Sequence, residues 1–134
     1  MRRVFIADDE EDVLASYELE LNLTGRYAVK TERFGKRVFE ALGNKEFVPD
    51  ILVLDIFFDY TDRASGEEIY RLIRQDPAPL YRNMPVLIMS GKIPETDLEM
   101  ERPEEKLFYM LKARGVLLKD KLDEIFCDKR GHIA

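Results

Sequence analysis

A short apolar run, Ile51 to Asp55, most constrains the fold of this 134-residue chain. Its first four residues are all apolar, and it ends at the carboxylate of Asp55. Such a run predicts a strand buried on both faces, as in the centre of a parallel sheet. Ligands bind at the carboxyl ends of strands in open parallel sheets, so Asp55 is a candidate site residue. The plainer interpretation is that Asp55 caps the next helix or turn.

Three other apolar segments also end at polar or charged side chains. They are Arg3 to Ala7 before Asp8 and Asp9, Pro85 to Met89 before Ser90, and Gly115 to Leu118 before Lys119. Helical patterns separate the segments, which is typical of βαβ units and a parallel sheet. Because the carboxyl ends of parallel strands share one edge, we expect these five polar side chains to converge: Asp8, Asp9, Asp55, Ser90 and Lys119.

Converging groups of these types suit phosphoryl transfer. Carboxylates at close range repel one another, and a hard divalent cation such as Mg²⁺ offsets that repulsion. A lysine and a serine hydroxyl can hold phosphoryl oxygens, and a carboxylate beside a metal can act as the nucleophile. Each group also has a structural alternative: an acidic helix N-terminus for Asp8 and Asp9, a turn for Ser90, and a solvated charge for Lys119.

In these motifs the chain resembles the receiver domain of two-component response regulators. The resemblance extends from Arg3 to about Phe126 and rests on the acid pair, Asp55 after its apolar run, Ser90 and Lys119. It implies that Asp55 is the phosphoacceptor and that Ser90 and Lys119 contact the phosphoryl group. It also implies a Mg²⁺ site. Its ligands would be Asp8, Asp9, Asp55 and the backbone carbonyl of Phe57.

The resemblance implies a flavodoxin-like α/β fold, a doubly wound (βα)5 parallel sheet with strand order 2-1-3-4-5. We expect one receiver domain over residues 1–134, with a core of about 3–128 and a tail over 129–134. A short strand is expected near 27–31. Helices are expected near 11–23, 36–42, 66–75 and 121–128, with two short helices beginning at Thr96 and Pro103.

The implied function is that of a phosphoacceptor signalling domain rather than an enzyme. A histidine kinase or histidine phosphotransfer protein would donate the phosphoryl group in a self-catalysed transfer, and the downstream protein target is not indicated. One alternative is a degenerate receiver that binds partners without phosphorylation. Another is a metal-dependent phosphatase with an aspartate nucleophile, although such enzymes usually carry a second acid where Phe57 stands here.

Some positions depart from the family pattern. Val116, three residues before Lys119, stands where the family usually has an aromatic ring, and Asp120 replaces the usual proline. We then expect phosphorylation to move the loop after Ser90 without an aromatic gate. The segment after Asp55 and the one between Ser90 and Lys119 are also longer than usual.

Composition excludes several other classes of protein. The net charge of −6 argues against direct nucleic-acid binding. Cys127 is the single cysteine and His132 the single histidine, so a disulfide or a Cys/His centre is poorly supported. No signal peptide or membrane-spanning run is recognisable, which favours a cytoplasmic location. A homodimer, and a receiver cut from a longer chain, are left open.

Overall fold

The computed structural model describes residues 1–44, 47–55, 66–75, 79–91, 101–113 and 115–127. The predicted tail and the short helix predicted at Thr96 lie outside these residues.

Five parallel strands form one sheet in the order β2-β1-β3-β4-β5, which confirms the predicted fold and topology. The strands are β1 (Arg2–Ala7), β2 (Tyr27–Glu32), β3 (Ile51–Asp55), β4 (Val86–Ser90) and β5 (Leu107–Leu111). All five residues of β3 and of β4 are buried, as expected for strands in the middle of a parallel sheet. Their carboxyl ends, at Asp55 and Ser90, therefore meet the same edge.

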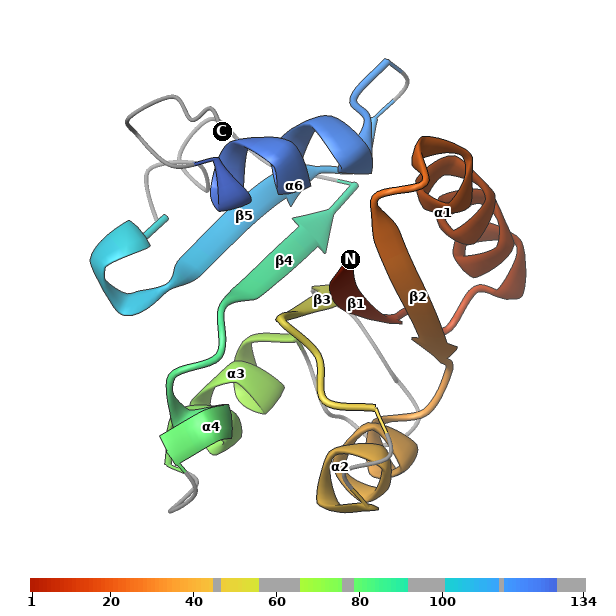
Figure 1. Cartoon of the computed structure of the whole chain (residues 1–134). Coiled ribbons are helices and arrows are strands. Elements are labelled where there is room, and N and C mark those ends of the chain that lie inside the picture. Colours follow the sequence, from red (N-terminus) through yellow and green to blue (C-terminus); the bar gives the residue numbers. More distant parts are fainter. Residues whose placement is uncertain (45–46, 56–65, 76–78, 92–100, 114, 128–134) are drawn as a thin grey trace.

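Helices cover both faces of the sheet (Figure 1). They are α1 (Glu11–Thr24), α2 (Gly35–Asn44), α3 (Gly66–Arg74), α4 (Pro79–Arg82) and α6 (Leu118–Phe126), with a 3₁₀ turn, η1, at Pro103–Glu105. Helix α1 ends at Gly25, whose φ of 71° is accessible to glycine at little cost and whose N–H donates to the carbonyl of Asn22. Within the described residues, no helix is long and apolar enough to cross a membrane.

Two apolar layers hold these helices to the sheet. On one face, Leu14 and Leu21 of α1 and Leu118 and Leu122 of α6 pack against side chains such as Ile6. On the other face, α2, α3 and α4 pack against alternate strand residues, through Val38, Leu42, Ile69, Ile73 and Tyr81. Successive strand residues point to opposite faces, so one continuous apolar run supplies both layers.

The prediction for the fifth strand is wrong. Residues 115–117 form no strand, and Leu118 begins α6. The strand is instead Leu107–Leu111, a segment whose apolar spacing had suggested a helix beginning at Pro103. Pro103 starts only the 3₁₀ turn, which ends at Lys106 with a φ of 57°. Leu107–Leu111 forms a strand and not a helix because it pairs with β4 in parallel. This pairing supplies backbone hydrogen bonds to the edge of the sheet, which a short helix would leave unpaired.

The outer edge of β5 is covered by the chain segment that precedes it. Arg102 and Leu107 exchange backbone hydrogen bonds in an antiparallel bridge. The N–H of Tyr109 donates to Oε1 of Glu101 at 3.0 Å, and the Lys121 ammonium of α6 donates to the same oxygen at 2.7 Å. The Glu101 carboxylate thus ties the edge strand to α6.

A polar contact also fastens the end of α6 to β2. The Asp123 carboxylate accepts hydrogen bonds from the Tyr27 hydroxyl and from the Arg26 guanidinium. Burial and the bond to Asp123 raise the pKa of Tyr27 above its ordinary value. A raised pKa in the folded state stabilises the fold below the pKa of an unfolded tyrosine, about 10, and this stabilisation is lost as the pH rises further.

We therefore expect the free energy of unfolding to fall above about pH 10, and to fall less steeply in Tyr27→Phe. The phenylalanine ring keeps the packing but has no proton to lose. Urea unfolding of both proteins between neutral and strongly alkaline pH measures the difference. Parallel curves for the two proteins would contradict a contribution from Tyr27.

Candidate phosphoacceptor and metal site

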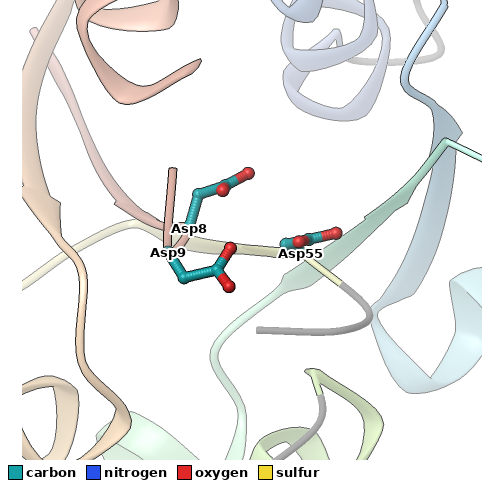
Figure 2. A group of neighbouring side chains, drawn as sticks. All are labelled: Asp8, Asp9 and Asp55. Atoms are coloured by element: carbon teal, nitrogen blue, oxygen red, sulfur yellow. The ribbon is translucent and has the colours of Figure 1, made fainter. Parts of the chain in front are cut away.

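Three carboxylates gather where β1 and β3 end (Figure 2). Asp8 and Asp9 follow β1, Asp55 is the last residue of β3, and one oxygen from each lies within 4.8 Å of the others. Asp8 is fully buried and Asp55 is 8% exposed, whereas Asp9 is exposed to solvent. The sequence predicted this convergence from the parallel arrangement of the strands.

The donor set suits a hard cation. Each carboxylate offers at least one oxygen, and one exposed member leaves a route from solvent. Asp8 is held in place by the N–H of Glu10, which donates to its Oδ1 at 2.9 Å as α1 begins. Phe57, whose backbone carbonyl was expected to be a further ligand, lies outside the described residues.

Lys112 supplies the positive charge of the site. It follows β5 directly, and its Nζ lies 3.0 Å from Oδ2 of Asp8 and 3.9 Å from Oδ1 of Asp55. Burial acts to lower the pKa of Lys112, but the hydrogen bond to Asp8 and the charges of Asp8 and Asp55 outweigh it and raise that pKa. The ammonium group therefore stays charged and partly neutralises the cluster.

Lys119, the lysine predicted for this place, is not at the site. It is the second residue of α6, and its backbone N–H donates to Oε2 of Glu20 at 2.6 Å. Among the described residues its side chain forms no ion pair with the three acids. The error follows from the misplaced fifth strand. The unusual length of the segment between Ser90 and Lys119 could have indicated the error, because Lys112 lies closer to Ser90 in the sequence.

Ser90 lies beside Lys112 at the same edge. It is the last residue of β4 and only 2% exposed, and it is in register with Leu111 of β5. Its backbone carbonyl accepts a hydrogen bond of 2.7 Å from the N–H of Lys112. The ends of β1, β3, β4 and β5 thus bring together the acids, the serine and a lysine.

The corrected strand also restores an aromatic residue. Tyr109 stands three residues before Lys112 and is 2% exposed, in the apolar layer under α3 and α4. Val116 is 40% exposed and lies outside the strand, and Asp120 belongs to the first turn of α6. Ala113 follows Lys112. The expected absence of a ring at this position is therefore wrong, and the prediction of a switch without one loses its basis.

Tyr17 of α1 is a neighbour of the site that sequence reasoning took only as part of the apolar face of the helix. Burial raises the pKa of its hydroxyl, and the charges of Lys112, Asp8, Glu20 and Asp55 act on the same hydroxyl. Only the folded arrangement brings Tyr17 near Lys112, Asp8 and Asp55, so no signal in the sequence marks this proximity.

Comparisons with known proteins give a consistent structural result. No protein-family model and no curated protein matches the sequence. Solved structures do match.

Three response regulators illustrate the match. A two-component response regulator from Cytophaga hutchinsonii is 18% identical with a TM-score of 0.75, and the match covers 94% of each chain. The Mn²⁺-bound form of response regulator Rcp1 is 18% identical with a TM-score of 0.68, over 93% of this chain and 89% of that one. The phosphorylated cyanobacterial phytochrome response regulator RcpA is 21% identical with a TM-score of 0.64, over 93% and 86% of the two chains. The chain therefore has the fold of a response regulator receiver domain.

Proposed function

We propose that this chain is a phosphoacceptor domain of two-component signalling, with Asp55 as the acceptor. The observation that carries the proposal is the cluster of Asp8, Asp9 and Asp55 within 4.8 Å, with the Lys112 ammonium 3.0 Å from Asp8 and 3.9 Å from Asp55. Two structures of the same fold add support, one described as bound to Mn²⁺ and the other as phosphorylated.

In the proposed reaction an oxygen of Asp55 attacks the phosphorus of a phosphohistidine, and the phosphorus–nitrogen bond breaks. The histidine leaves with the electron pair of that bond and takes up a proton. Asp8, Asp9 and Asp55 would hold a Mg²⁺ ion, with the backbone carbonyl of Phe57 as a further proposed ligand. The bound ion would neutralise the charge of the phosphoryl oxygens. The chain positions the reacting groups itself, so the transfer needs no separate catalyst.

The other side chains would hold the transferred group. Lys112 takes the role that the sequence had suggested for Lys119: its ammonium can turn from Asp8 to a phosphoryl oxygen on Asp55. The Ser90 hydroxyl can donate to another phosphoryl oxygen from the end of β4. The donor would be a histidine kinase or histidine phosphotransfer protein in the cytoplasm, and the whole chain would act as one receiver domain.

The degenerate receiver is the weaker proposal. Its support was the supposed loss of the aromatic ring at Val116 and of the proline at Asp120, together with the altered segment between Ser90 and Lys119. With Lys112 at the site, Tyr109 supplies the ring and the interval after Ser90 is shorter, while Ala113 stands in place of the proline. The three acids, Ser90 and a lysine all remain at the strand ends.

The test is the intact mass of the protein after incubation with acetyl phosphate and Mg²⁺. We expect one phosphoryl adduct in the native protein, none in Asp55→Asn, and none when EDTA removes the metal. Asp50→Asn is a matched control, because Asp50 precedes the same strand at its other end and should leave the adduct intact. An unmodified native protein, or an adduct that persists in Asp55→Asn, would contradict the assignment of Asp55.

A further inference from the structure

A hollow lies at the edge of the sheet opposite the acid cluster, where β4 and β5 begin. It has a volume of about 490 Å³, and its lining includes Tyr70, Arg71, Gln75, Arg82, Asn83 and Lys106. Helix α4 leads into β4 at this edge, next to α3 (Figure 1). The five residues of β4 separate this edge from the acids, a length of about 17 Å at the rise of a strand. The hollow is thus distinct from the phosphoacceptor site.

One arginine fixes the walls of this hollow. Nη1 of Arg74 donates to the carbonyls of Arg82 and Met84 at 3.2 and 2.8 Å, and its Nη2 donates to those of Glu105 and Lys106 at 2.9 and 3.1 Å. The guanidinium also lies 4.7 Å from the centre of the Tyr70 ring. Arg74 therefore ties α3 to the entry of β4 and to the turn before β5, so the hollow exists before any ligand arrives.

The charge of the hollow is opposite to that of the whole protein. Its described lining residues include four cations, Arg71, Arg74, Arg82 and Lys106, and two acids, Glu104 and Glu105, a balance of +2 in a chain of net charge −6. The Glu105 carboxylate also forms an ion pair with Arg102, whose Nε lies 3.8 Å from Oε2 of Glu105. Among the described residues, Arg71, Arg82 and Lys106 have no carboxylate within ion-pair distance. Their donors remain available to an anion from solution.

We propose that this hollow binds a small, multiply charged phosphate compound. Two guanidinium groups, Arg71 and Arg82, can each grip two phosphate oxygens, and the Lys106 ammonium adds a third cation. The side-chain amide of Gln75, which also lines the hollow, is a neutral donor beside them. Arg74 already donates its terminal N–H groups to four carbonyls, so it contributes its positive charge and holds the walls in place, but does not grip the ligand directly. A volume of about 490 Å³ suits a compound of nucleotide size rather than a protein surface.

The experiment is a calorimetric titration of the whole chain with sodium pyrophosphate in the presence of EDTA. Without a divalent cation the cluster of Asp8, Asp9 and Asp55 repels pyrophosphate, so the titration reports binding in the hollow and not at the phosphoacceptor site. We expect the native protein to bind, and the double variant Arg71→Gln/Arg82→Gln to bind at least about tenfold more weakly, the effect of one lost charge-assisted contact. The control Lys30→Gln/Arg37→Gln loses the same charge elsewhere on the surface and should stay within about twofold of the native affinity.

Three results would overturn the proposal. The first is the absence of pyrophosphate binding in the native protein. The second is an equal loss in both double variants, which would mean unspecific attraction between charges. The third is tighter binding of a triglutamate peptide than of pyrophosphate, which would assign the hollow to an acidic protein segment. Arg71 and Arg82 are exposed, and urea unfolding of each variant verifies that the fold is intact.

Discussion

Replacing Lys112 with methionine should lower the free energy of unfolding in metal-free buffer by about 3 kcal/mol, the cost of leaving one partner of a buried ion pair alone. Asp8 is fully buried, and the Lys112 ammonium is its ion-pair partner at 3.0 Å. The variant keeps much of the aliphatic packing but removes the ammonium charge from beside Asp8 and Asp55. Urea unfolding in EDTA measures the loss.

Lys119→Met is the matched control for that experiment. The side chain of Lys119 forms no ion pair with the described acids of the site, and its backbone N–H, which donates to Glu20, is kept by the substitution. We expect its unfolding curve to lie within about 0.5 kcal/mol of the native one. Added Mg²⁺ should restore part of the stability of Lys112→Met, because a divalent cation can replace the ammonium charge. Equal losses in the two variants would contradict the position of Lys112.

Replacing Arg74 with alanine should cost about 2 kcal/mol, because several carbonyl groups lose a charged donor while water can solvate the exposed ones. The guanidinium donates to four carbonyls, and only the bond to Met84 is the shorter, partly buried kind at 2.8 Å. Arg74→Lys should restore little, since a single ammonium cannot span carbonyls from two separate turns. Thermal and urea unfolding report the change.

Arg71→Ala serves as the control for Arg74→Ala. Both arginines belong to α3, but the side chain of Arg71 is exposed and, unlike that of Arg74, donates no hydrogen bond to another described residue. The two alanines gain the same helix propensity, so the difference between the variants isolates the four carbonyl contacts. If Arg71→Ala is as destabilised as Arg74→Ala, the carbonyl contacts are not what stabilises this edge of the sheet.

Strands β1, β3 and β4 could be predicted because local and global signals agree in them. The apolar runs that end at Asp8, Asp55 and Ser90 are buried on both faces, and their order along the chain fixes which edge carries the polar ends. The three acids follow from this arrangement alone. Burial on both faces leaves little freedom in how such a run can be interpreted.

The fifth strand shows where such reasoning ends. Leu107–Leu111 carries apolar residues at every position, which fits both a helix face and a strand, and a proline a few residues earlier favoured the helix. Pairing with β4 decides the matter, and pairing is a contact between distant parts of the chain. Because Lys112 depends on that strand, one wrong boundary moved the predicted lysine to Lys119. The contacts of Tyr17 and Arg74 are equally long-range.

The cover over β5 limits how two copies of this protein can meet. An exposed edge strand offers unpaired N–H and C=O groups that another strand can extend, a route to aggregation as well as to assembly. Here the backbone groups of Leu107 are bonded to Arg102, and the N–H of Tyr109 is bonded to the Glu101 carboxylate. A strand that paired with this part of the edge would first have to displace the Arg102 backbone and the Glu101 carboxylate. The beginning of β5 is therefore protected against backbone pairing with a second copy by groups of this chain itself.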